Sequence, residues 1–225
     1  MRLIEVCKDV QLVYGTDLVS QMNAFLRASE RYETQEFSDR VFTVEEHQDW
    51  FMRTYQKCID TGRNVFLEEF KAWNFPKIAL KPLIMGEFNP LTPEEKILLR
   101  LCMPLPNKSY IIGVCKESDK SDGRHETAHG LRHTNERYRA KVDAVVRSIP
   151  QADREPVMEH LRRQTYAEHV MLDEAHAYIM CELEYMAKDN VPIENLREAS
   201  EALHTLFDTH FQPTTEFGAD LARRA

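Results

Sequence analysis

The chain has 225 residues, of which 43% are hydrophobic, 29% are charged and only 7 are glycine. This length and composition indicate a globular protein with much helix and a sizeable core, and they exclude a largely disordered chain. A formal net charge of -8 argues against nucleic acid as the main partner, because such a polyanion is bound through a concentrated basic surface.

No uncharged stretch approaches the roughly 20 residues of a membrane-spanning helix, and the first residues lack the apolar run of a secretory signal. The five cysteines are scattered and include no C-x-x-C pair, which favours a reducing compartment over a disulfide framework or a thiolate metal site. We therefore expect a cytoplasmic protein without a membrane partner.

The first part of the chain, residues 1–85, has the character of a mixed scaffold or subdomain. VQLVY at 10–14 predicts a strand. Thr43, followed three residues later by Glu46, is a capping-box pattern that opens an amphipathic helix. Four prolines between 76 and 93 then predict an irregular connection, which is a candidate subdomain boundary.

The second part, residues 86–225, is predicted to be mainly helical and to form one domain with the first. Thr92, with Pro93 behind it, opens a helix, and YIIGV at 110–114 predicts a strand. The helical pattern from Gly123 to Ile149 has a break near Asn135. Further helices are expected at 153–164, 167–187 and 193–210.

The first turns of the Gly123–Ile149 stretch contain the sequence HETAH, from His125 to His129. Residues four apart lie on the same face of a helix, so both imidazoles can converge on one ion with Glu126 beside it. A zinc ion with two neutral imidazoles and one further protein ligand keeps a position open for water, whose pKa it lowers toward about 7. Glu126 is then the candidate general base. The alternative is a helix whose histidines only form hydrogen bonds.

A third metal ligand has to come from another segment, and residues 166–186 are the best candidate. His133 lies a further turn along the helix, too far for a compact tetrahedral site, and is better placed at its rim. Glu174 shares a helical face with otherwise uncharged residues, where a bare carboxylate is costly unless a cation compensates it. His176 and His169 remain alternative third ligands.

Two neighbours of Glu174 have candidate supporting roles. Tyr178, one turn further along, could donate a hydrogen bond to the oxyanion that forms during hydrolysis, or could pack in the core. Asp173 points away from Glu174 and is placed to accept a hydrogen bond from the free ring nitrogen of His125 or His129.

Over residues 108–186 the chain resembles the zincin metallopeptidases, and among them the gluzincins, whose third zinc ligand is a glutamate on a later helix. The resemblance implies that His125, His129 and Glu174 bind zinc and that Glu126 is the general base. It also implies an edge strand that pairs with extended substrate, for which KSYIIGVCK at 108–116 is the candidate. The third histidine of metzincins and the Asn-Glu-x-x-x-Asp signature of many gluzincins are missing.

These patterns predict an α+β, helix-rich, zincin-like fold with a small sheet before the active-site helix. The predicted function is that of a zinc-dependent metallopeptidase with a peptide or protein substrate. One alternative is a zinc hydrolase of a small non-peptide amide, which needs a closed pocket instead of an open groove. Another is a non-enzymatic helical interaction protein whose metal has four protein ligands.

Overall fold

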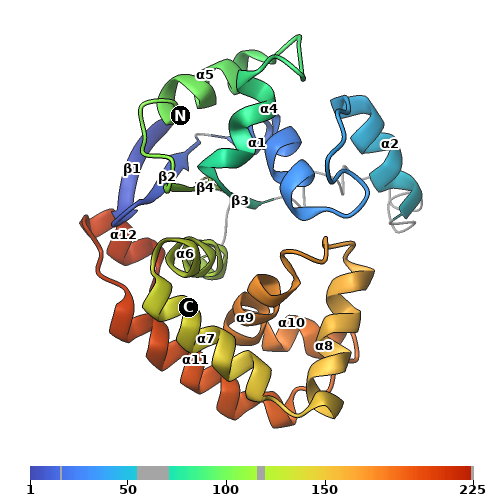
Figure 1. Cartoon of the computed structure of the whole chain (residues 1–225), viewed down its shortest axis with the longest axis vertical. Coiled ribbons are helices and arrows are strands. Elements are labelled where there is room, and N and C mark those ends of the chain that lie inside the picture. The colour runs from blue at the N-terminus through green and yellow to red at the C-terminus, as the bar shows by residue number, and fades with distance from the viewer. Residues whose placement is uncertain (16, 55–70, 116–119, 224–225) are drawn as a thin grey trace.

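The computed structural model of the protein describes residues 1–15, 17–54, 71–115 and 120–223. A four-stranded mixed sheet lies between two groups of helices, so the fold is α+β as expected (Figure 1). Its strands stand in the order β1-β2-β4-β3. Their bounds are Arg2–Cys7 for β1, Val10–Tyr14 for β2, Ala72–Pro76 for β3 and Tyr110–Val114 for β4.

Pairing in this sheet brings distant parts of the chain together. β1 and β2 form an antiparallel hairpin, β2 runs parallel to β4, and β3 runs antiparallel to β4. The central strand β4 therefore comes from the second part of the chain, whereas its neighbours come from the first. Sequence analysis proposed β4 as an edge strand; this was wrong, because β3 covers its outer side.

One face of the sheet is covered by helices that lie between residues 18 and 102. Side chains alternate between the two faces of a strand, and Val13, Phe75 and Ile111 belong to the hydrophobic cluster on this side. The Arg27 Nε atom donates a hydrogen bond to Oε1 of Glu95 at 2.7 Å and joins two of the covering helices. The elements here are α1 (Leu18–Glu33), α2 (Val44–Thr54), η2 (Lys77–Leu80), α4 (Lys81–Ile84) and α5 (Pro93–Cys102).

The capping box predicted at Thr43 and the helix start predicted at Thr92 are both confirmed. Thr43 and Glu46 exchange reciprocal hydrogen bonds at the start of α2, and Thr92 does the same with Glu95 at the start of α5. The amphipathic helix was predicted from the sequence TVEEHQDWFMRTYQKC at 43–58, and the residues of this sequence after Thr54 lie outside the described residues. Sequence analysis did not identify β1, β3 or α1.

The other face of the sheet is covered by helices from the second part (Figure 1). The break predicted near Asn135 is confirmed, since its side chain caps a new helix by accepting from the Tyr138 amide. The helices are α6 (Lys120–Thr134), α7 (Glu136–Ser148), α8 (Gln151–Arg163), α9 (Met171–Cys181), α10 (Leu183–Lys188), η3 (Glu194–Leu196), α11 (Arg197–His210) and α12 (Glu216–Leu221).

Helix α6 lies directly against the sheet because it has a glycine where the two surfaces meet. A Cβ atom at Gly130 would lie 2.6 Å from Cγ1 of Val10, which is closer than real contacts of this kind. Ala128 and Leu131 on the same helix are buried in the core cluster. With this side of α6 against the sheet, its other side faces α9. Within the described residues, no helix combines the length and apolar character needed to span a bilayer.

Candidate metal centre

The two histidines of HETAH lie one turn apart on α6 and face α9. Their ring centroids are 4.9 Å apart. The His129 side chain is fully buried and that of His125 is nearly so. The predicted geometry of the motif, with two imidazoles on one face of a helix, is therefore confirmed.

Glu174 completes a group that could hold a metal ion. It lies in the first turn of α9, which packs across α6. One ligand atom from each of His125, His129 and Glu174 lies within 4.8 Å of the others. Nε2 of His129 and Oε2 of Glu174 are 3.7 Å apart. That separation is close to the roughly 3.4 Å between two atoms bound tetrahedrally at about 2.1 Å.

The polar atoms at this position fit a cation. Nε2 of His129 and Oε2 of Glu174 are buried and have no hydrogen-bond partner among the described residues. Buried polar atoms without partners carry a desolvation cost, which is largest for charged groups. A divalent cation between these two atoms would satisfy both at once, and imidazole nitrogen with carboxylate oxygen is a donor set that suits zinc.

Asp173 orients the imidazole of His129. Its Oδ1 atom lies 3.0 Å from Nδ1 of His129, and its Oδ2 atom lies 3.5 Å from Nη1 of Arg132. Burial alone would raise the pKa of Asp173, but the charge and hydrogen bond of His129 outweigh it and hold that pKa below its usual range. A proton on Nδ1 leaves the Nε2 lone pair toward Glu174. Asp173 is therefore placed as the sequence predicted, with His129 as its partner.

Burial shifts the pKa values of His125 and Glu126 in opposite directions in the metal-free protein. It lowers the pKa of His125 well below its usual value, and the neighbouring His129 and His176 add to this effect, which favours the neutral ring that binds a metal. Burial raises the pKa of Glu126 to about 8, against the opposing charge of His129. A cation bound beside Glu126 would lower that pKa and favour the ionised form that a general base needs.

Tyr178 lies beside this group, and a second tyrosine accompanies it. The Tyr178 ring packs against His125 with centroids 5.3 Å apart, and its hydroxyl lies 3.2 Å from the hydroxyl of Tyr166. Burial raises the pKa of Glu174, and the charge of His129 and the nearby Tyr166 hydroxyl oppose that shift. The position of Tyr178 allows the predicted role toward an oxyanion, which stays a prediction. Tyr166 was missed because it lies before α9, in an isolated bridge with Thr34, where no periodic pattern marks it.

The other histidines of this region have different neighbours. His176 contacts the Tyr138 hydroxyl through Nε2 at 2.8 Å, His169 packs on the ring of Tyr32, and His133 packs on the ring of Tyr110. None of the three belongs to the group of possible metal ligands found among the described residues. The geometry therefore favours Glu174 over His176 and His169 as the third ligand.

The ionisable groups of this site predict how the metal-free protein responds to pH. Burial raises the pKa of Glu174 to about 7 and that of Glu126 to about 8, while the charges of Glu174 and Asp173 overcome burial and raise that of His129 to about 10. Each group binds a proton more tightly in the folded protein than in the unfolded chain. The free energy of unfolding should therefore fall as the pH rises from 7 to 9.

Urea unfolding of the metal-free protein at several pH values measures this slope. The pKa values of His125 and Asp173 are lowered in the folded protein, so these two groups change the free energy of unfolding only below about pH 6.5. They do not oppose the expected fall between pH 7 and 9. Saturating zinc should flatten the curve, because the ion replaces the protons. A free energy of unfolding that rises between pH 7 and 9 without metal would contradict these assignments.

Comparison of the chain with protein-family models, curated proteins and solved structures finds no significant match. The interpretation of the site therefore depends on its residues and their geometry.

Proposed function

We propose that the chain is a zinc-dependent metallopeptidase, with His125, His129 and Glu174 as metal ligands and Glu126 as general base. The observation that carries this proposal is the convergence of three ligand atoms from two helices within 4.8 Å, with Glu126 next to the first ligand. Within the described residues the group has three protein side chains. Three protein ligands are typical of catalytic zinc sites, whereas structural sites use four.

In the proposed reaction the side chains of the protein transfer the proton and orient the reacting groups. Zinc, when bound, would polarise the substrate carbonyl and lower the pKa of water. Glu126 accepts the proton of the attacking water at Oε2 as the new C–O bond forms, and then delivers it to the nitrogen of the departing amine as the peptide C–N bond breaks. Tyr178 is the candidate donor to the oxygen on which negative charge develops.

The sheet edge favours a peptide over a small amide as the substrate. β3 is an edge strand and α6 packs against it. An extended peptide can pair with such an edge through main-chain hydrogen bonds. Sequence analysis assigned the pairing with an extended substrate to residues 108–116. We propose that β3 pairs with the substrate instead.

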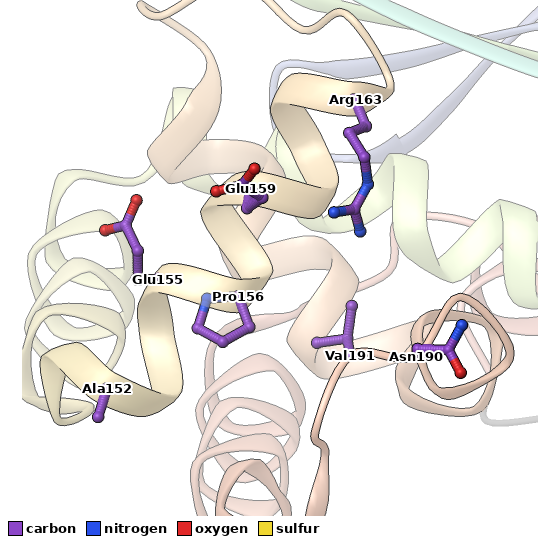
Figure 2. A pocket seen from close by; sticks show the side chains of 7 residues that line it. All are labelled: Ala152, Glu155, Pro156, Glu159, Arg163, Asn190 and Val191. Atoms are coloured by element: carbon purple, nitrogen blue, oxygen red, sulfur yellow. The ribbon is translucent and has the colours of Figure 1, made fainter.

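A cavity of about 430 Å³ lies elsewhere, between α8 and the turn that follows α10. Its polar lining includes Glu155, Glu159 and Arg163 on one side and Asn190 on the other (Figure 2). None of the proposed catalytic or ligand residues lines it. This cavity is therefore not the substrate pocket of the proposed centre.

Removal and return of the metal tests the proposed function. The purified chain should cleave an unstructured labelled protein such as fluorescent casein, or members of an internally quenched peptide library. A strong chelator should abolish cleavage, and one equivalent of zinc per chain should restore it. Cleavage that survives complete removal of the metal would refute the proposal, as would a zinc-loaded chain that cleaves no member of the library.

A further inference from the structure

Two tyrosine hydroxyls meet beside the candidate metal centre. The hydroxyl of Tyr166 lies 3.2 Å from that of Tyr178, and the Tyr178 ring packs edge-to-face with His125. We infer that Tyr166 is a positioning residue, whose hydroxyl directs the proton of the Tyr178 hydroxyl toward the substrate oxygen on which charge develops. This inference rests on the proposed function, because it takes Tyr178 as the donor to that oxygen.

The Tyr178 ring is held next to the proposed ligands from several sides. Tyr178 follows Glu174 by four residues and therefore lies one turn further along the same face of α9. Besides His125, its ring contacts the rings of His160 and Tyr185, with centroids 5.8 and 6.4 Å away. Because these contacts restrict the ring, the direction of its hydroxyl proton is the main freedom that remains.

The hydrogen-bonding capacity of a phenol gives the second hydroxyl its role. Each hydroxyl has one proton to donate and two lone pairs that accept. If Tyr178 donated to Tyr166, it would have no proton for a substrate oxygen. If Tyr166 donates to Tyr178, the Tyr178 proton can point to that oxygen. Negative charge on the substrate favours this second arrangement, because a hydroxyl that accepts a hydrogen bond becomes a stronger donor.

The backbone of Tyr166 is fixed by the end of α1, which is distant in sequence. An isolated antiparallel bridge pairs Tyr166 with Thr34, the residue that follows α1. Next to this bridge, the Ala167 amide donates a hydrogen bond to the carbonyl oxygen of Glu33 at 2.7 Å. The first part of the chain therefore helps to hold a side chain that reaches the candidate metal centre.

The end of α8 sets the direction of the chain at the same tyrosine. The Tyr166 amide donates to the carbonyl oxygen of Leu161 at 3.3 Å, and the Thr165 amide donates to that of Arg162 at 2.9 Å. This pair of bonds ends a helix through a residue in the left-handed conformation, which is usually glycine. Here it is Thr165, with a φ of 65°. A β-branched residue adopts this conformation only where its surroundings impose it, and the bridge at Tyr166 is part of those surroundings.

The exposure of the two tyrosines suits contact with a substrate. Both are partly exposed and pack at the edge of the core cluster, whereas Ala167, Ala177 and Ile179 beside them are buried. The rings therefore belong to the packing of α9, and the hydroxyl pair lies where a substrate can reach it.

The test is a double-mutant cycle on the two hydroxyls. Tyr178→Phe removes the donor and should lower kcat roughly 10²- to 10³-fold, the range for one oxyanion donor. Tyr166→Phe removes a hydrogen bond between neutral groups and should lower kcat roughly 3- to 10-fold. The double variant should be no slower than Tyr178→Phe, because Tyr166 acts through Tyr178. A structural role of Tyr166 would not make its loss depend on the Tyr178 hydroxyl.

Tyr185→Phe is the matched control. Its ring also contacts Tyr178, but its hydroxyl accepts a hydrogen bond from Gln164 at 3.5 Å, so this variant should keep the wild-type kcat. The substrate is the library peptide that the wild-type chain cleaves fastest. KM, zinc content and thermal unfolding are measured for every variant and should change little.

Each contrary result has a distinct meaning. Wild-type kcat in either single variant, or an equal loss from Tyr166→Phe with and without the Tyr178 hydroxyl, would overturn the inference and leave the proposed function standing. Loss of zinc or of the fold in Tyr166→Phe would make Tyr166 merely structural and also overturn the inference. A wild-type chain that cleaves no peptide would overturn the proposed function and the inference together.

Discussion

Replacement of Glu126 by glutamine should lower kcat for peptide hydrolysis roughly 10²- to 10⁴-fold, the range that a general base contributes. Glutamine has nearly the same shape as glutamate. It cannot accept a proton at the position of Oε2. The variant should therefore keep its fold and its zinc while it loses turnover, as measured by peptide cleavage, metal analysis and thermal unfolding.

A nearby carboxylate provides the matched control for this variant. Oε1 of Glu182 lies 3.9 Å from Nδ1 of His125, but Glu182 is not in the group of possible metal ligands among the described residues. Glu182→Gln should therefore retain most of the wild-type kcat. If Glu126→Gln hydrolyses the peptide as fast as the wild type, Glu126 is not the base and the proposed mechanism is wrong.

The second large effect concerns the third ligand. Glu174→Ala should weaken zinc binding more than about 100-fold, because loss of a direct ligand exceeds the 10- to 100-fold effect of losing a residue that orients one. Asp173→Asn removes such an orienting residue from His129 and should fall within that smaller range. Competition with a chromophoric chelator measures both affinities in the otherwise unchanged protein.

Two further variants give this comparison its controls. Glu159 is exposed on α8 and lines the remote cavity in Figure 2. Glu159→Ala therefore removes one negative charge, as Glu174→Ala does, but leaves the proposed metal ligands unchanged. His176→Ala tests His176, which sequence analysis kept as an alternative third ligand. Zinc that survives Glu174→Ala but is lost from His176→Ala would transfer the third ligand position to His176.

The local parts of the site were predictable from sequence, and the non-local parts were not. A four-residue spacing on one helix places His125 and His129 together whatever surrounds them. The burial argument for Glu174 needed only the uncharged neighbours on its own helical face. In the same way, the separation of Asp173 from Glu174 by one position predicted that the two carboxylates would have different partners.

The role of β3 depends on pairing between distant segments. Its sequence AWNFP is short, and its asparagine and proline disfavour a strand, so only its antiparallel pairing with β4 makes it one. For the same reason β4 was taken as an edge strand, since no local pattern shows which strand lies outermost. Tyr166 was missed because its hydroxyl contact with Tyr178 joins two different parts of the chain.

X-ray absorption at the zinc edge of the wild-type chain, loaded with one equivalent of the metal, tests the central claim most directly. The spectrum should show two imidazole nitrogens at about 2.0–2.1 Å with the remaining positions occupied by oxygen at about 2.0–2.2 Å. Sulfur near 2.3 Å would place the metal on cysteines, of which the chain has five, and would contradict a centre built from His125, His129 and Glu174.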